Sequence, residues 1–323
     1  MLDNKDKKIL GILANNSKIP KKQLAKKVQL SREVVDYRLK RLEEKGIILE
    51  YQTRLNLCAF SIMGNNLFLK LKYYDEKQEK ALVKFLEKQK YTHFIAKVGG
   101  NYDYMIGFTI KKIIDLEFYI EDLYDKFNDI ILEHDTFTML EEIKDNVATI
   151  FDNKSQENFI SIKPITDKPK IDEIDKKIIL EIANNSRISS VEIGNKLNLT
   201  SSAITYRIKN LEKMSVILGY RTIIDVLKLE KQFYYISFNI HNLNKENKQK
   251  VKNEIISNSN IVFANHLSGK YSYVCWLFAE NNSDFYEIIK KIQNNLPELT
   301  NFTTYTVLEF VYHNYIPDGF LND

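Results

Sequence analysis

Apolar side chains recur at helical spacing at the start of the chain and predict three short helices. Their buried stripes are Ile9, Leu10, Ile12 and Leu13, then Leu24, Ala25 and Val28, then Val35, Leu39 and Leu42. We expect Asp3 or Asp6 to cap the first helix and Ser31 to cap the third. Gly46 should end the third helix, and residues 29–30 should form the tight turn before it.

The pattern then changes to runs of aromatic and branched residues, which are typical of strands. Strands are predicted at 67–74, 92–98, 103–110 and 134–143, with amphipathic helices at 76–90 and about 115–127. The order β-α-β-β-α-β is that of a ferredoxin-like α+β sandwich. Such a sheet has helices on one face and leaves the other face for a partner sheet.

The chain repeats itself at a fixed offset. Residues 2–55 align without a gap with residues 171–224, and 21 of 54 positions are identical. The offset of 169 still holds where Gly100 to Tyr104 match Gly269 to Tyr273. The predicted fold class is therefore α+β, with two tandem copies of a three-helix (winged) helix-turn-helix domain followed by a ferredoxin-like sandwich.

The polar segment 153–170 contains two of the five prolines and is expected to be a linker with little structure of its own. It separates two similar halves. The expected domains are a first helix-turn-helix domain at 1–55, a first ferredoxin-like domain at 64–152, a second helix-turn-helix domain at 171–224 and a second ferredoxin-like domain at 231–323.

Positive charge is concentrated in the two helical segments. Residues 1–54 carry a net charge of +7 and residues 170–221 a net charge of +3, so the rest of the chain carries −6 of the total of +4. Two basic segments on an acidic body suit a polyanionic partner. A short helix, a tight turn and a longer basic helix form a unit whose second helix fits the major groove of duplex DNA. The alternative is a small bundle of ordinary solvated helices.

The outward face of the longer helix supplies the candidate DNA-binding residues. In the first copy, Arg32, Glu33 and Asp36 are placed to meet base edges. Arg38, Lys40 and Arg41 are expected to neutralise phosphates. The whole predicted set is Ser31, Arg32, Glu33, Asp36, Tyr37, Arg38, Lys40, Arg41, Thr200, Ser201, Ser202, Thr205, Tyr206, Arg207 and Lys209. Because the copies differ at the base-reading positions, we expect an imperfect palindrome as the operator.

The sequence lacks the motifs typical of membrane proteins, exported proteins, metal sites and common enzymes. No run approaches about 18 apolar residues, the start has no apolar export signal, and Cys58 and Cys275 stand far apart. The histidines have no acidic or cysteine companions at ligand spacing, and no nucleophile elbow or phosphate loop is present. We therefore expect a cytoplasmic protein with no catalytic residues, no metal and no cofactor.

Each half resembles the Lrp/AsnC family of bacterial and archaeal regulators. The resemblance rests on LDxxDxxIL from Leu2, LAxxxxLS from Leu24, RLKRLEEKGII from Arg38 and GxYDY from Gly100. It implies sandwiches that dimerise through their sheets, assemble further into homo-oligomers and bind an amino acid between neighbours. Here the two sandwiches of one chain could pair as a pseudo-dimer, or pair with another chain.

The same resemblance implies an effector region. Its residues would be Gly100, Asn101, Tyr102, Asp103, Thr136 and Thr138. In the second copy Ser272 replaces Asp103, which removes the carboxylate that would hold an amino group. The glycines would otherwise serve only a tight turn, and it stays open whether either copy binds an effector.

Two other functions are weighed. Haem-pathway (sirohaem) decarboxylases resemble the same two-part fold, but their His-Asn-Tyr segment near the sheet has no counterpart at His93 or at His266. His313-Asn314-Tyr315 lies instead at the C-terminus. The second alternative is an assembly or sensor protein without DNA binding, which the weaker charge of the second head makes conceivable for that copy.

Overall fold

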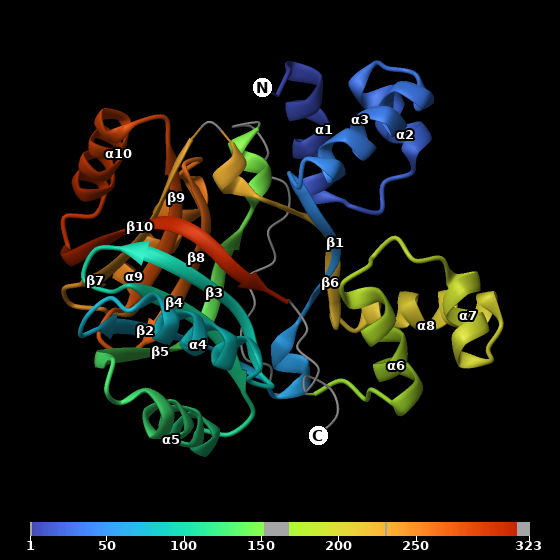
Figure 1. Cartoon of the computed structure of the whole chain (residues 1–323). Coiled ribbons are helices and arrows are strands. Elements are labelled where there is room, and N and C mark those ends of the chain that lie inside the picture. The colour runs from blue at the N-terminus through green and yellow to red at the C-terminus, as the bar shows by residue number, and fades with distance from the viewer. Residues whose placement is uncertain (1, 152–167, 230, 315–323) are drawn as a thin grey trace.

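The computed structural model describes residues 2–151, 168–229 and 231–314. Within these residues two helical heads lie on one side of a β-barrel, and both repeats contribute to both parts (Figure 1). The first head consists of α1 (Asn4–Asn15), α2 (Lys21–Val28), α3 (Arg32–Glu44) and β1 (Ile48–Leu55). The second head consists of α6 (Glu173–Ala183), α7 (Ser190–Leu197), α8 (Ser201–Lys213) and β6 (Ile217–Ile224).

The remaining elements follow the same order in both repeats. The first repeat continues with η1 (Leu57–Phe60), β2 (Met63–Leu71), α4 (Glu76–Glu87), β3 (Thr92–Gly99), β4 (Tyr104–Ile110), α5 (Ile114–Phe127), β5 (Ile131–Asp145) and η2 (Val147–Ile150). The second continues with η3 (Val226–Lys228), β7 (Gln232–Ile240), α9 (Lys245–Ser257), β8 (Ile261–Ser268), β9 (Tyr273–Ala279), α10 (Asn282–Asn295) and β10 (Leu299–His313). The predicted β-α-β-β-α-β order is confirmed in each repeat.

Local capping fixes the helix ends of the heads. The Asp3 carboxylate accepts from the backbone N–H of Asp6, and Ser31 accepts from that of Val34, so both predicted N-caps are confirmed. Gly46 takes the left-handed φ of +61° that ends α3, and Ser215 takes the same role after α8 with φ of +56°. A side chain costs free energy at such a φ, and the second head accepts that cost.

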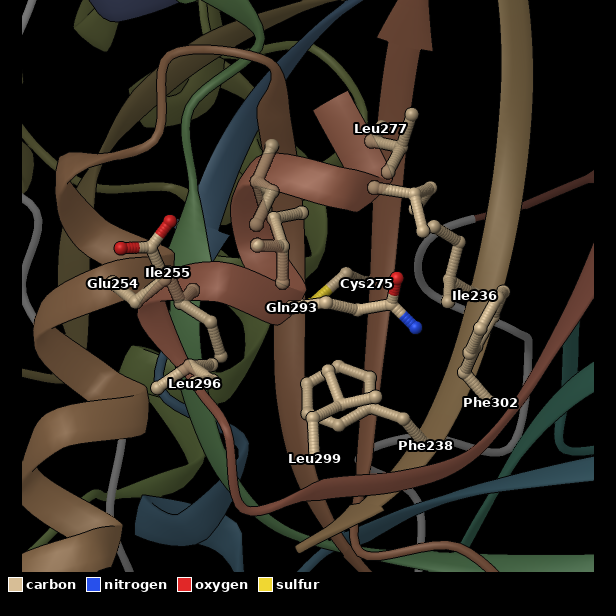
Figure 2. A pocket seen from close by; sticks show the side chains of 13 residues that line it. Ile236, Phe238, Glu254, Ile255, Cys275, Leu277, Gln293, Leu296, Leu299 and Phe302 are labelled. Carbon is tan, nitrogen blue, oxygen red and sulfur yellow. The ribbon is translucent and has the colours of Figure 1, made fainter. Parts of the chain in front are cut away.

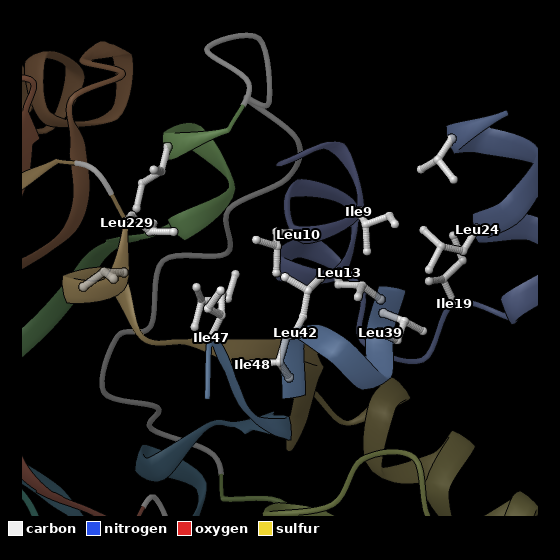
Figure 3. Packing of buried hydrophobic residues seen from close by; sticks show 14 of the residues in the cluster. Ile9, Leu10, Leu13, Ile19, Leu24, Leu39, Leu42, Ile47, Ile48 and Leu229 are labelled. Atoms are coloured by element: carbon white, nitrogen blue, oxygen red, sulfur yellow. The ribbon is translucent and has the colours of Figure 1, made fainter. Parts of the chain in front are cut away.

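Each head has its own apolar core, and the first core extends to the barrel. Leu10, Leu13 and Leu42 pack between the helices of the first head, and the same cluster reaches Leu229 and Phe233 of the second repeat (Figure 3). The second core is built from Ile178, Ile182, Ile204, Ile208 and Leu211 and reaches back to Leu55 and Ala59 of the first repeat. Each head is thus held in place by residues from the opposite repeat.

A two-stranded antiparallel ribbon joins the heads. Strand β1 pairs with β6, with Gln52 opposite Arg221. Ser17 and Ser186, equivalent residues of the two repeats, are fully buried and their hydroxyl oxygens lie 2.7 Å apart. The backbone N–H of each serine donates across the ribbon, to Tyr220 O and Tyr51 O respectively. Equivalent residues meet in this way around a pseudo-two-fold axis between the heads.

The eight long strands form one closed antiparallel barrel in the order β10-β3-β4-β2-β5-β8-β9-β7. The repeats meet at two seams, where β5 pairs with β8 and β10 pairs with β3. Phe68, Phe137, Tyr235 and Tyr305 pack together in the cluster that draws on both repeats. Of the two pairings that the sequence left open, pairing of the two sheets within one chain is observed, and closure at both edges is a feature that the sequence pattern did not indicate.

Several strands begin or end at residues other than those predicted. Strand β2 begins at Met63 instead of residue 67 and ends at Leu71 instead of residue 74, and β5 extends to Ile131 and Asp145 at its two ends. Both strands pair on two sides, which stabilises residues with weak strand propensity such as Asn65 and Asn66. The predicted linker, residues 153–170, lies outside the described residues except for 168–170.

Candidate nucleic-acid interface and effector region

Helix α3 presents a polar face to solvent on the first head. Val35, Leu39 and Leu42 are buried toward the head core. The other side exposes Arg32, Glu33, Tyr37 and Lys40, and 66% of the Tyr37 surface is accessible to solvent. Ser31 is also exposed while it caps the helix. We call this exposed face the ridge of the head. A helix with such a face fits the width of the DNA major groove, and its polar side chains can reach the base edges.

Part of the predicted set is engaged inside the head. The guanidinium of Arg38 lies 2.6 Å from Asp3 Oδ2 and 2.7 Å from Asp6 Oδ1, and that of Arg41 lies 2.5 Å from Asp6 Oδ2. Asp36 pairs with Lys21 at 2.8 Å. The hydrogen bond from Arg38 lowers the pKa of Asp3. The arginine contacts tie α3 to the N-terminal end of α1, and the Lys21 contact ties it to α2.

Helix α8 repeats this arrangement with less charge. Arg207 binds Asp172 at 2.8 Å and Asp175 at 2.7 Å, as Arg38 binds its two aspartates. Tyr206 is 67% exposed, and Ser202, Thr205 and Lys209 are exposed beside it. Thr200 caps the helix, its hydroxyl 3.0 Å from that of Ser202, and the hydroxyl of Ser201 lies 3.1 Å from that of Ser190. The second ridge therefore offers hydroxyl groups where the first offers charges.

Helices α2 and α7 differ more in charge than α3 and α8 do. Helix α2 exposes four lysines, whereas α7 exposes Lys196 and the acidic Glu192. The lysines are Lys21, Lys22, Lys26 and Lys27. The first helix of a helix-turn-helix unit crosses the phosphate backbone. The predicted DNA-binding set does not include these lysines, although their spacing within KKQLAKK was the available signal.

The predicted effector residues are not all brought together. The turn at Gly100, with φ of +137°, faces the backbone of Thr304 and the ring of Tyr305 on the last strand of the other repeat. Thr136 and Thr138 lie on β5 next to the equivalent turn of the second repeat, where Gly269 approaches Thr136 O and Ser268 pairs with Thr138. Each glycine turn thus meets the last strand of the opposite repeat.

The carboxylate of Asp103 already has partners. It accepts from Lys70 Nζ at 3.0 Å and from the backbone N–H of Leu71 at 2.8 Å. In the second repeat the equivalent pair is Asn239 and Ser272, whose side chains also bond to each other. The ion pair of the first repeat is therefore replaced by a neutral pair in the second, which favours a structural role for Asp103.

Tyr102 connects the first turn to the opposite repeat. It is 3% exposed, and its hydroxyl donates to Asp135, which Lys270 of the second turn also binds at 2.9 Å. Burial and the bond to Asp135 raise the pKa of Tyr102 to about 12. Asn101 remains exposed at the tip. The region is thus a polar junction between the two repeats.

An apolar pocket lies elsewhere, in the second repeat. It sits among strands β7 and β9 and helices α9 and α10, with Cys275 and Gln293 among the side chains around it (Figure 2). Its free volume of about 20 Å³ suffices for roughly one water molecule. Burial raises the pKa of the Cys275 thiol to about 12, so the thiol stays protonated. This pocket is too small for an amino acid.

Neither a candidate metal site nor a membrane-spanning helix is found among the described residues. They contain no group of three or more His, Cys, Asp or Glu side chains that could hold a metal ion. No described helix is both long and apolar enough to cross a bilayer. Burial lowers the pKa of His93 to about 3, so its imidazole is neutral at neutral pH.

Sequence comparisons agree with this architecture. The winged helix-turn-helix DNA-binding family matches residues 2–48 and 171–217, and the Lrp/AsnC ligand binding domain matches residues 234–317. An uncharacterized HTH-type transcriptional regulator of Pyrococcus horikoshii is 51% identical over 55 residues, which is 17% of this chain and 36% of the relative. The match thus spans about a third of that relative's length.

Longer matches have lower identity. The HTH-type transcriptional regulator LrpB of Bacillus subtilis is 27% identical over 45% of this chain and 94% of its own length. The leucine-responsive regulatory protein of Haemophilus influenzae is 27% identical over 44% of this chain and 86% of its own length. Both relatives are about as long as one repeat.

The match to a siroheme decarboxylase, solved alone and with an iron-uroporphyrin III analogue, covers both repeats. The crystal structure of the siroheme decarboxylase NirDL superimposes with a TM-score of 0.62 over 97% of this chain and 94% of that chain, at 10% identity. At this identity the likeness shows the fold alone. The family matches show that the chain carries winged helix-turn-helix DNA-binding domains in both repeats and, in the second repeat, the ligand binding domain of the Lrp/AsnC regulators.

Proposed function

We propose that this chain is a transcriptional regulator in which two fused repeats take the place of a dimer. The observation that carries the proposal is the pair of exposed ridges on α3 and α8, held around one pseudo-two-fold axis by the β1–β6 ribbon and the Ser17–Ser186 contact. One chain then presents two heads at a fixed separation, which raises the effective concentration of the second head once the first is bound.

The two heads would read different half-sites. Arg32 and Glu33 at the start of α3 offer a fork of donors and a carboxylate, whereas Ser201 and Ser202 offer hydroxyls at the start of α8. The operator is therefore proposed to be an imperfect palindrome. Assembly into larger particles and a cytoplasmic location belong to the same proposal.

The test uses the exposed positions and leaves the internal ion pairs intact. Duplexes selected from random DNA are titrated with the wild-type protein, with Tyr37→Ala/Lys40→Ala and with Tyr206→Ala/Lys209→Ala. We expect salt-dependent binding, an asymmetric consensus, and loss of footprint over a different half-site in each variant. No salt-sensitive affinity for any duplex would overturn the proposal.

Effector binding is a separate part of the proposal. An amino acid at the Gly100 turn would have to compete with Lys70 for the carboxylate of Asp103. We therefore expect Lys70→Met to increase the affinity for amino acids, measured by calorimetry, with Asn239→Met in the second repeat as the matched control. If neither variant nor the wild type binds any amino acid, the sandwich domains serve assembly only.

A decarboxylase of the same fold is the remaining alternative. What favours it is the likeness to the siroheme decarboxylase, and that likeness shows the fold alone. His93 is neutral at neutral pH and therefore offers no imidazolium as a general acid there. An absorbance change on adding a tetrapyrrole would count against the regulator proposal.

A further inference from the structure

A broad groove runs along one flank of α8 on the second head. It is lined by Lys170, Asp175, Ala203, Tyr206, Arg207, Asn210, Lys213 and Met214, and its volume is about 660 Å³. One wall is α8, and the other is formed by Lys170, before α6, and by Asp175 of α6. The groove is open along its length, which suits a chain that passes through it better than an enclosed small molecule.

The groove carries a net positive charge. Arg207 is shared by Asp175 at 2.7 Å and Asp172 at 2.8 Å, so these three groups together leave one negative charge beside the groove. Lys170 and Lys213 then contribute two exposed ammonium groups, one on each wall. The Tyr206 hydroxyl and the Asn210 amide add neutral donors. Ammonium, hydroxyl and amide donors are the groups that contact phosphate oxygens in protein–DNA complexes.

The first head lacks the substitutions that open this groove. Val34 and Arg41 stand where the second head has Ala203 and Asn210, and the Arg41 guanidinium fills its flank by binding Asp6 at 2.5 Å. Glu44 stands where the second head has Lys213, and its carboxylate would repel a phosphate. The second head has therefore exchanged an internal ion pair for an open cationic flank.

We propose that this groove holds the sugar–phosphate backbone of operator DNA beside the second recognition helix. A helix in the major groove has one backbone on each flank, and the groove lies on the flank away from α7. Lys170 and Lys213 then supply phosphate affinity that α7, with Lys196 and Glu192, does not provide. The inference rests on the proposed DNA binding and assigns residues that sequence analysis did not include.

The experiment compares two charge-matched variants of the full chain. Lys170→Gln/Lys213→Gln removes both ammonium groups of the groove, and Lys290→Gln/Lys291→Gln removes two exposed ones from α10. Affinity for a selected duplex is measured between about 50 and 200 mM salt, where each lost phosphate contact lowers the log–log slope by about 0.9. We expect a fall of about 1.8 for the groove variant and no change for the control.

A second variant tests the shape of the groove. Ala203→Val/Asn210→Arg recreates the filled flank of the first head, and hydroxyl-radical footprinting should then lose protection on one strand beneath the second head only. If the wild type binds DNA and both groove variants match the α10 control, the groove has no role and the proposed regulator stands. If the wild type binds no duplex, the regulator proposal itself fails.

Discussion

The two heads bury their central carboxylate in different ways. In the first head, Asp6 has a side chain that is 1% exposed and is held by both Arg38 and Arg41. In the second head, Asp175 is 13% exposed and is held by Arg207, with Asn210 in place of the second arginine. The same frame thus tolerates two charge arrangements, and the comparison shows which ion pairs shape the head and which surfaces remain for a partner.

Removing the guanidinium groups should give the largest difference between the heads. Arg38→Ala/Arg41→Ala leaves the Asp6 charge buried without a cation, which costs about 3–5 kcal/mol. Arg207→Ala should cost less, about 1–3 kcal/mol, because Asp175 is partly solvated. Urea unfolding, with hydrogen exchange in α1 and α6, measures both effects. Adding Asp6→Ala to the double variant should recover stability, and equal costs in the two heads would contradict this account.

The sequence predicted features with local causes and missed those that depend on distant pairing. The N-cap at Ser31 and the end of α3 at Gly46 follow from the residues themselves, and the structure confirms them. The β1–β6 ribbon and the two barrel seams depend on backbone hydrogen bonds between repeats, which leave little trace in side-chain pattern.

Pairing between distant segments also explains why Arg38 was predicted to bind phosphate instead of an internal carboxylate. Helical spacing places it outward, but Asp3 and Asp6 approach it from another helix. The available signal was that both aspartates and the arginine recur together in the second repeat, as Asp172, Asp175 and Arg207. A recurring charge set of this kind indicates an internal contact as readily as a DNA contact.

The barrel halves differ at Gly107, which the second repeat replaces with Trp276. A Cβ at Gly107 would lie 2.1 Å from the ring of Phe94 and 2.5 Å from that of His93, so no larger residue fits without displacing them. Gly107→Ala should therefore cost about 1–3 kcal/mol through overpacking. Urea unfolding measures the cost, and Gly219→Ala, where a Cβ meets no atom within 4 Å, shows the effect of backbone strain without crowding. Equal or smaller loss at Gly107 would contradict the packing argument.

Acid should destabilise the first repeat through His93, which is Val262 in the second. The folded pKa of His93 is about 3, below the ordinary value of 6.5, so below pH 6.5 the unfolded chain binds a proton that the folded chain does not. The free energy of unfolding therefore decreases as the pH is lowered below 6.5, by up to about 1.4 kcal/mol per pH unit and by about 2 kcal/mol in total at pH 5. His93→Val should flatten the stability curve between pH 6.5 and 4. The exposed His241→Gln is the control, and parallel curves for His93→Val and wild type would disprove the assignment.

The smallest effect is expected where the repeats are most alike, at the Ser17–Ser186 contact. Either serine changed to alanine leaves the other hydroxyl buried without this partner, at a cost of about 1–2 kcal/mol. Changing both removes donor and acceptor together, so the double variant should be no less stable than either single variant. A double-mutant cycle in urea reports this coupling.

The cycle also tests whether the heads behave as one unit. The two hydroxyls belong to different heads, and the residues beside them bond across the ribbon, where Arg187 Nε donates to Ser17 O at 2.7 Å. If the heads move independently, each hydroxyl finds water when its partner is removed, and the coupling energy is close to zero. If the ribbon holds them together, no water replaces the lost hydroxyl and the coupling approaches the cost of a single substitution. A coupling near zero would therefore remove the fixed separation on which recognition of two half-sites by one chain depends.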